Sequence, residues 1–414
     1  MNKQQRHAWV VNHHAVIPSK DGSAARHLHL ARQLKKHGWE TSLIVASTRH
    51  PSGEQTLNGL FRTRSTLEDG VPVLAIRSKS YTAGMYARVI GMVSFALNLS
   101  LPRATASLER PDVVIGSTVH PLAAWAGSIL AKRNKVPFVF EIRDVWPDAL
   151  VELGMFSENS VIARAVRALM ISIAKQAALV VAPLPHVDRW LQEQGLGDKP
   201  FVWVSNGTEV TSETPPVPVP DREHFTFMYL GAHGNANVLD TVIDAFDEAC
   251  QRRPDLNLRL RLVGQGPKKE ELIAYAATLR STANISFEDR IPASEVKARA
   301  AEADAMISAL AGLPMYRYGI SLNKLFTYLD SGRPTVWASS APNNPIREAN
   351  AGICVESDDR EALTKAIIDM ATTPVEERTE MARRGWQYVK ENYSFEVLGR
   401  CLADSLDRVV EVGG

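Results

Sequence analysis

Short, continuous apolar runs separated by helical patterns constrain the fold of this chain more than any other feature. In the first half the runs are residues 8–11, 41–46, 71–76, 112–116, 136–142, 178–182 and 201–205. They do not alternate between polar and apolar residues, so both of their faces must be covered, as in a parallel sheet. The helical pattern after Gly22 stops at Gly38, which is a typical helix end.

A proline-rich segment at residues 211–222 interrupts this alternation and can form neither a helix nor a sheet ladder. The pattern then restarts, with apolar runs at residues 225–231, 257–264, 284–288, 304–310, 334–339 and 352–355. We therefore predict an α/β protein with two Rossmann-like, doubly wound domains. The predicted domains are residues 1–210 and 223–390, joined by the linker 211–222, and residues 391–414 form a terminal helix.

The charge balance and the cysteines exclude several classes of protein. Lys and Arg number 47 against 46 Asp and Glu, so no global basic field indicates nucleic acid. The cysteines, Cys250, Cys354 and Cys401, are far apart and show neither a disulfide framework nor metal-ligand spacing. The N-terminal segment lacks the apolar core of a secretory signal. We expect a cytoplasmic protein with no bound metal.

The longest nearly uncharged stretch, Val89 to Pro102, lies between Arg88 and Arg103. It is shorter than the roughly 20 apolar residues that a membrane-spanning helix needs. It is either a buried helix, which the residues alone favour, or a helix at a membrane surface with cationic flanks near lipid headgroups. The second interpretation predicts peripheral contact through residues 84–103.

Open α/β sheets bind ligands outside the carboxyl ends of their strands, so the loops there hold the candidate site. Glycines in these loops can bring backbone N–H groups to a phosphate, although each also suits a plain strand–helix turn. The donor-binding candidates among these loop residues are Gly22, Gly231, His233, Gly234, Asn235 and Gly264.

Two loops of the first domain carry polar candidates. His120 lies in Gly-Ser-Thr-Val-His-Pro and is either a polar cleft residue or a structural loop residue. Arg143 and Asp144 end the strand at 136–142, followed by Trp146 and Pro147. They form either an ion pair that shapes the loop, or a site in which Asp144 holds a sugar hydroxyl or accepts its proton.

Residues 315–336, MYRYGISLNKLFTYLDSGRPTV, are the most informative run. A Gly319-Ile-Ser321 loop is expected to enter a helix at about Ser321, whose free N–H groups form an anion site. Asn323 lies in this helix start, and Lys324 adds a full positive charge. The combination suits a nucleotide diphosphate.

This run resembles the retaining GT-B glycosyltransferases of family 4. It is closest to the bacterial surface-polysaccharide branch that includes L-fucosamine transferases, which shows YGxSxNKxFxYxxxGxP and RDxWP patterns. Here the patterns begin at Tyr318 and Arg143. Residues 231–234, 263–267 and 204–210 also match in order, so the resemblance covers nearly the whole chain.

The resemblance implies two Rossmann-like domains facing across a cleft, with a nucleotide sugar on the second domain and the acceptor on the first. The terminal helix would pack back on the first domain. Transfer of a hexose-type residue, acetamido or deoxy sugars included, would retain anomeric configuration and need no bound metal. The donor sugar is expected to be linked to UDP. The acceptor would be a glycan or a polyprenyl-diphosphate-linked glycan at the inner face of the inner membrane, in O-antigen, capsule or exopolysaccharide synthesis. Asp144, Arg143, His120 and Lys324 are the catalytic candidates.

The chain departs from the family in two places. The wider family carries a carboxylate for the ribose seven residues before the Gly-x-Pro proline, where this chain has Thr327. Glu348 or Glu356 is the expected substitute, and Glu348 is the preferred candidate. The family's Arg and Lys after the first strand of this domain are missing from residues 232–237, which shifts phosphate binding toward Lys324.

Two alternative functions remain open from the sequence. A GT-B nucleotide-sugar 2-epimerase needs carboxylates beside the sugar, and Asp144 and Asp148 would supply them. A non-catalytic sugar-nucleotide-binding partner of another transferase would account for Thr327.

Overall fold

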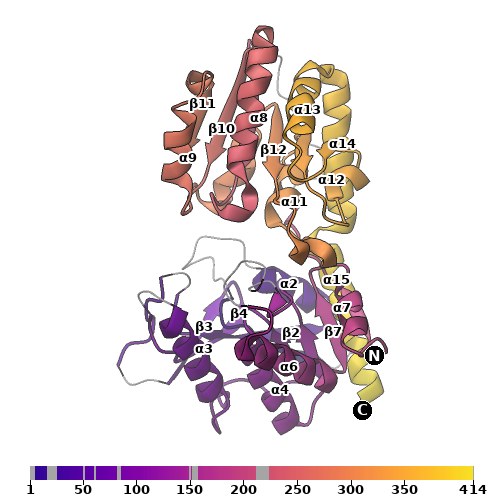
Figure 1. Cartoon of the computed structure of the whole chain (residues 1–414). Helices are drawn as coiled ribbons and strands as arrows, with labels where there is room; N and C mark the ends of the chain where they lie inside the picture. Colours follow the sequence, from indigo (N-terminus) through magenta and orange to yellow (C-terminus); the bar gives the residue numbers. More distant parts are fainter. Residues whose placement is uncertain are drawn as a thin grey trace. The chain divides into compact units, whose positions relative to one another are not determined.

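A computed structural model describes residues 5–15, 26–49, 52–59, 62–81, 85–148, 151, 157–210 and 223–413. The chain forms two compact units, one of Met1–Ser205 with Phe395–Gly414 and the other of Asn206–Ser394. The division falls after Ser205 rather than after residue 210, and the predicted linker 211–222 lies outside the described residues. The predicted α/β class with parallel sheets is confirmed in both units (Figure 1).

The first unit is built on a sheet in the order β3-β4-β2-β1-β5-β6-β7-β8. Its strands are β1 Arg6–Val11, β2 Trp39–Ala46, β3 Thr63–Glu68, β4 Val71–Ile76, β5 Val113–Ser117, β6 Phe138–Glu141, β7 Leu179–Ala182 and β8 Phe201–Trp203. Its helices are α2 Arg26–Lys36, α3 Met85–Leu99, α4 Pro121–Asn134, α6 Val161–Gln176, α7 Val187–Glu193 and α15 Phe395–Gly413.

One strand of this sheet was not predicted. β3 pairs antiparallel with β4, whereas the other neighbouring strands run parallel. Its sequence, TRSTLE, is largely polar because an edge strand needs no cover on both faces.

The terminal helix α15 packs in the first unit, although it is last in sequence. It contributes Phe395, Leu398, Leu402 and Leu406 to the same buried cluster as α2. The Phe395 ring stacks on His29 with centroids 4.6 Å apart. The helix begins at Phe395 rather than at residue 391, because α14 Val375–Asn392 continues to that point in the second unit.

The second unit has an all-parallel sheet in the order β11-β10-β9-β12-β13-β14. Its strands are β9 Phe225–Leu230, β10 Leu258–Val263, β11 Ile285–Glu288, β12 Ala305–Ala309, β13 Thr335–Ala338 and β14 Gly352–Val355. Its other helices are α8 Leu239–Arg252, α9 Lys269–Ala276, α10 Val296–Ala300, α11 Asn323–Asp330, α12 Pro345–Glu348 and α13 Arg360–Thr372. The short 3₁₀ turn η1 spans Asn235–Asn237.

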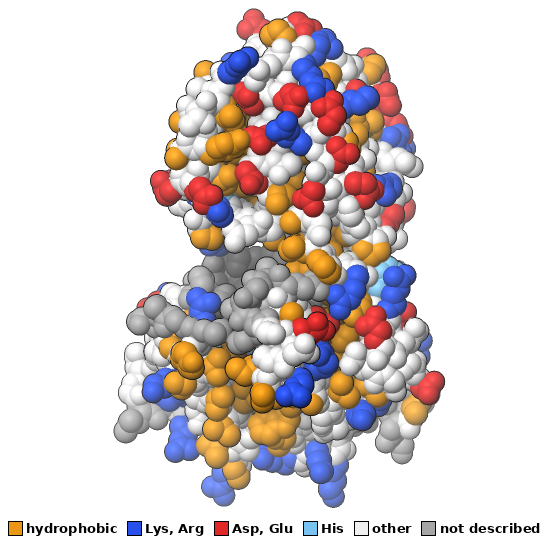
Figure 2. Space-filling view, viewed as in Figure 1, with side chains coloured by type: hydrophobic (Ala, Val, Ile, Leu, Met, Phe, Trp, Pro, Cys, Tyr) orange, Lys and Arg blue, Asp and Glu red, His pale blue; other side chains and the backbone are white. Residues whose placement is uncertain are grey.

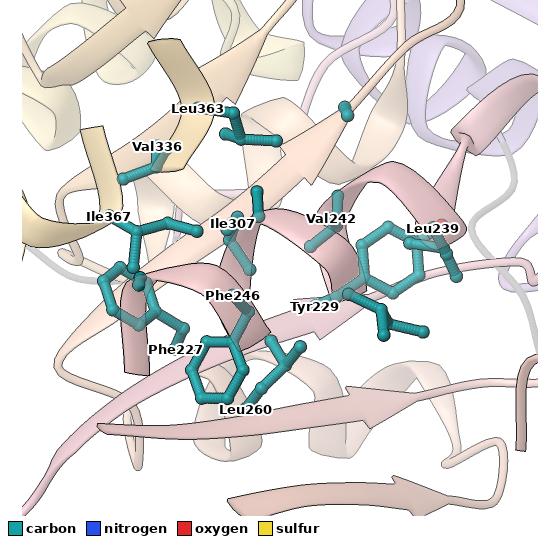
Figure 3. Close-up of a cluster of buried hydrophobic side chains, with 14 of the residues drawn as sticks. Phe227, Tyr229, Leu239, Val242, Phe246, Leu260, Ile307, Val336, Leu363 and Ile367 are labelled. Atoms are coloured by element: carbon teal, nitrogen blue, oxygen red, sulfur yellow. The ribbon is translucent and has the colours of Figure 1, made fainter. Parts of the chain in front are cut away.

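The apolar runs of this sheet are covered on both faces, as their continuity predicts. On one face Phe227, Tyr229 and Ile307 pack with Phe246 of α8 and Ile367 of α13 (Figure 3). On the other, Met228 and Met306 pack with residues of α11, and both methionines are fully buried. Covering both faces leaves the carboxyl ends of the strands as the place for ligand loops.

Within the described residues, no helix is both long and apolar enough to cross a bilayer.

Candidate functional site

The loop after β9 is held against the loop after β10 by their backbones. The Gly231 N–H donates to the Val263 carbonyl at 3.1 Å, and the His233 N–H donates to the Gln265 carbonyl at 3.0 Å. Gly264 has φ +154°, and a Cβ there would lie 1.9 Å from the Gly231 oxygen. Only glycine permits this approach, so the predicted Gly231 and Gly264 shape one continuous surface.

Lys324 lies in the first turn of α11, beside this loop. Its Nζ donates to Asn237 Oδ1 at 2.6 Å and lies 5.0 Å from the centroid of the Tyr229 ring. Burial lowers the pKa of Lys324 to about 7. The charged form of this amine therefore needs an anionic ligand, and a diphosphate would supply one.

Two side chains tie α11 to the end of β9. The Tyr328 hydroxyl accepts from the Leu230 N–H and donates to the Leu230 carbonyl, each at 2.9 Å. Asn237 donates from Nδ2 to the Ala232 carbonyl at 2.8 Å while it accepts from Lys324. The ammonium and the glycine loop are thus held at a fixed separation.

The start of α11 differs from the prediction. The helix begins at Asn323 rather than at Ser321, and its N-cap residue Leu322 forms no side-chain cap. Asn206 binds Ser321 through both its N–H and its side chain, at 2.8 and 2.7 Å, which holds this residue outside the helix. Gly319, at φ +94°, makes the turn before it. Without a capping side chain, the first N–H groups of α11 remain a site for an anion.

Thr327, at the position of the family's ribose carboxylate, and Glu348, the expected substitute, both form hydrogen bonds within the protein. Thr327 donates its hydroxyl to the Asn323 carbonyl at 3.1 Å. Glu348 accepts from the Asn344 N–H at 2.9 Å and from the Tyr388 hydroxyl, so both carboxylate oxygens have partners. Binding a ribose through Glu348 would require exchanging one of these hydrogen bonds.

His233 and Asn235 follow Gly231 in the same loop. His233 is fully buried, and its ring nitrogens have no hydrogen-bond partner among the described residues. Burial, together with the charge of Lys269, lowers the pKa of His233. Asn235, next to Gly234, lines a hollow of about 250 Å³ with Lys268 and Glu271. A neutral His233 ring offers a hydrogen bond but no charge.

In the first unit, a buried polar network joins the ends of several strands to the start of α2. Glu141, the last residue of β6, accepts from Arg26 Nε at 3.1 Å and contacts His27 Nε2 at 2.7 Å. Arg26 also donates to the carbonyls of Val204 and Ser205, just after β8. Because Arg26 lies 115 residues away from Glu141 in the chain, no local sequence pattern marks Glu141 as part of a site.

The proton positions in this network follow from its geometry. Asn12 Nδ2 lies 3.3 Å from His27 Nδ1 and can only donate, so Nδ1 accepts and Nε2 carries the proton given to Glu141. Burial lowers the pKa of His27, which keeps it neutral. For Glu141, burial is outweighed by His27, Arg26 and Arg143, and its pKa is well below the ordinary value. The charged pair is therefore Glu141 with Arg26.

Arg143 and Asp144 follow this network. Of their two interpretations, the structure does not show the ion pair, because within the described residues neither side chain has a hydrogen-bonded ionic partner. The Arg143 N–H donates to Thr118 Oγ1 at 2.9 Å, and its charge acts on Glu141. Asp144 is exposed to solvent. The Trp146–Pro147 peptide is cis, and Asp148 pairs with Arg167 at 2.9 Å. Asp144 therefore keeps its carboxylate available for a ligand.

His120 has a structural role that the sequence left open. Its Nδ1 caps α4 by accepting from the Ala123 N–H at 3.3 Å. Its ring lies edge-on to His13, with centroids 4.6 Å apart. Burial, with the charge of His14, lowers the pKa of His120 to about 3. It is thus neutral, with Nε2–H as its donor.

Two predictions have no structural test. Gly22 lies outside the described residues. Among the described residues, no group of three His, Cys, Asp or Glu side chains is arranged to hold a metal ion.

Two family models match the chain in succession. "Glycosyl transferase 4-like domain" matches residues 21–207, and "Glycosyl transferases group 1" matches residues 224–373. A curated relative is the GDP-mannose-dependent alpha-(1-6)-phosphatidylinositol monomannoside mannosyltransferase of Mycolicibacterium smegmatis. It is 30% identical over 176 residues, which are 40% of this chain and 44% of that protein. The match thus spans less than half of the relative.

Solved structures share the two-domain fold at low identity. The E. coli trehalose-6-phosphate structure bound with UDP-2-fluoro glucose aligns with a TM-score of 0.71 and 10% identity, covering 97% of this chain and 98% of that one. WaaG, a glycosyltransferase involved in lipopolysaccharide biosynthesis, aligns with a TM-score of 0.64 and 13% identity, covering 97% and 99%.

We predict that Glu141→Gln destabilises the first unit by about 3–5 kcal/mol, because it leaves the buried Arg26 charge uncompensated. The low pKa of Glu141 has a second consequence: its contribution is complete above the pKa of an unfolded glutamate and is lost as pH falls toward the folded value. Urea unfolding of both proteins across acidic pH measures this. Glu54→Gln, which breaks a surface pair with Arg49, should cost less than about 1 kcal/mol. Equal effects of the two substitutions would refute the assignment.

We predict that the affinity for UDP or GDP falls as pH rises through about 7, where Lys324 loses its proton. Calorimetric titration between about pH 6 and about pH 8.5 measures this affinity on both sides of the pKa of Lys324. Lys324→Arg stays charged and corrects for titration of the ligand phosphate. The same pH slope in both proteins would remove Lys324 from the anion site.

Proposed function

Since the chain carries both domains of a GT-B glycosyltransferase, we propose that it transfers a hexose-type residue from a nucleotide sugar with retention of anomeric configuration. The observation that carries this proposal is Lys324 beside the uncapped start of α11 and the glycine loop after β9. These groups form a cationic, donor-rich surface of the kind that stabilises a leaving diphosphate.

Catalysis in this proposal is electrostatic. The acceptor hydroxyl attacks the anomeric carbon on the face that the diphosphate leaves, and its proton passes to a diphosphate oxygen. Lys324 and the N–H groups of α11 stabilise the negative charge that develops there. The chain supplies positive charge without a resident metal ion, and no side chain forms a covalent intermediate.

The donor is proposed to be UDP-linked, with an acetamido or deoxy hexose among the candidate sugars. The structural similarity to a protein bound with UDP-2-fluoro glucose supports UDP, whereas the curated relative is GDP-mannose-dependent. With Thr327 and Glu348 both engaged by the protein, the ribose would bind through backbone groups or through a rearranged Glu348.

The acceptor is proposed to be a glycan, free or on a polyprenyl diphosphate, in bacterial surface-polysaccharide synthesis. The family 4 resemblance of the RDxWP loop and the structural similarity to WaaG support this role. Asp144 would contact the acceptor or the sugar, since its carboxylate has no ionic partner among the described residues. Arg143 and neutral His120 would orient it. The enzyme would then act at the inner face of the inner membrane and would contact the membrane through residues 84–103.

We predict that Lys324→Ala lowers turnover on the order of 100-fold, as loss of one preorganised donor does in other enzymes. Nucleotide release from UDP-, GDP- and TDP-sugars, with and without lipid-linked acceptors, measures turnover and identifies the donor. Lys365→Ala removes an exposed lysine that pairs with Asp369 in the same unit, and should leave turnover unchanged.

Three outcomes would contradict the proposal. Turnover of Lys324→Ala within a few-fold of wild type would exclude the leaving-group role. Epimerised sugar from the donor alone would indicate the 2-epimerase. A non-catalytic partner would be indicated by two results together. The chain would bind the nucleotide without releasing it on any acceptor, and Lys324→Ala would leave the activity of its complex with another transferase unchanged.

We predict that Asp144→Asn impairs acceptor use more than donor binding, because the carboxylate lies in the first unit and Lys324 in the second. Its KM for acceptor or its kcat should change while the Kd for the nucleotide stays constant. Glu158→Gln, an exposed carboxylate before α6, is the matched control. A defect confined to nucleotide binding would contradict this placement.

A further inference from the structure

Three helices of the first unit carry cations and no acidic residue at all. α3 has Arg88, α4 has Lys132 and Arg133, and α6 has Arg164, Arg167 and Lys175. α3 packs on α4, and α4 packs on α6, so the three form one helical layer. The chain as a whole is nearly neutral, with a formal net charge of +1. The positive charge of this layer is therefore a local property.

Most of this charge is not neutralised by the protein. Arg167 pairs with Asp148, and Arg133 donates to the carbonyls of Ser100 and Leu101. The remaining cations are exposed and form no ion pair within the described residues; they are Arg88, Lys132, Arg164 and Lys175. Such a layer attracts an anionic surface.

The outer side of α3 is apolar. The exposed residues repeat at helical spacing, with exposed fractions of 86% for Tyr86, 46% for Val89, 47% for Ile90, 39% for Val93 and 57% for Leu97. The opposite side is apolar too, because Phe95, Ala96 and Leu99 are buried in the unit. A helix with apolar residues on both its inner and its outer side is normally covered on both sides.

A second exposed apolar site lies in the same layer, at the start of α6. Val161 is 72% exposed and Ile162 is 55% exposed. Figure 2 shows hydrophobic side chains gathered over this part of the first unit, with Lys and Arg along the border. An apolar centre with a cationic border matches the interface of an anionic bilayer, where side chains enter the headgroup region and cations meet phosphates.

We propose that the layer of α3, α4 and α6 docks on an anionic lipid bilayer, with the Tyr86–Leu97 side of α3 in the headgroup region. A second copy of this chain is a poorer occupant, because an isologous contact would bring two cationic layers together. The proposal deepens the proposed function, which places the acceptor on a lipid, but its test requires no turnover. Docking and transferase activity can thus fail separately.

The test is co-sedimentation of the full chain with vesicles of phosphatidylglycerol and phosphatidylcholine, compared with phosphatidylcholine alone. Binding should require the anionic lipid and should weaken with added salt. Each cation at such a surface contributes on the order of fivefold to the partition coefficient. Lys132→Glu with Arg164→Glu should therefore lower binding by more than about tenfold.

Ile90→Ser with Val93→Ser tests the apolar part. It should lower binding more than about tenfold because both side chains leave water in the docked state. Lys36→Glu, on α2, and Leu67→Ser, 69% exposed on β3, are the matched controls and should bind like wild type. Circular dichroism and the nucleotide affinity of every variant show that the fold is retained.

Several results would overturn the proposal. These are equal binding to neutral and anionic vesicles, no binding to either, or variants in the layer that bind like the controls. Salt-sensitive binding to duplex DNA without vesicle binding would assign the layer to nucleic acid. A dimer in light scattering that Ile90→Ser with Val93→Ser abolishes, without vesicle binding, would assign it to a second copy.

Discussion

All strands of the second sheet run parallel, and this constraint places the candidate donor-binding groups of the second unit around Lys324. Parallel strands end at one edge, so loops from distant parts of the sequence meet there. The loop after β9, the loop after β10 and the start of α11 meet in this way. Gly264 permits the backbone contact with Gly231, and Tyr328 fixes α11 to Leu230. The position of Lys324 follows from these contacts.

Burial gives these fixed groups their chemical character. Lys324 lies against Tyr229 and Trp337, and this environment makes its charged form costly in the absence of a ligand. In the first unit the opposite holds for Glu141, whose charge is stabilised by Arg26 and by a neutral His27. The second unit thus holds a cation, Lys324, with no ionic partner among the described residues, whereas the first unit neutralises the buried charge of Glu141 with Arg26.

The first unit has two groups of polar side chains, one buried and one exposed. The Glu141 network is internal and ties β1, β6, the segment after β8 and α2 together, so it holds the loops that carry Arg143 and Asp144. The acid-free layer of α3, α4 and α6 is external. Apart from Arg167, its cations have no ion pair among the described residues, and exposed aliphatic side chains lie in the same layer. The internal network is satisfied by the protein, and the external layer is not.

The sequence by itself determined the two α/β domains and nearly every strand, because the apolar run of a strand buried on both faces is a local signal. It missed β3, whose edge position leaves it polar, and it placed the start of α11 at Ser321. It also selected Lys324 and Asp144. Only the tertiary structure decided that the charge of Arg143 acts on Glu141 as well as on its neighbour Asp144. It also decided that Asn206 holds Ser321 outside the helix and that Tyr388 contacts Glu348. The partners in these contacts are far apart along the chain, and no local pattern encodes which of many polar residues will meet.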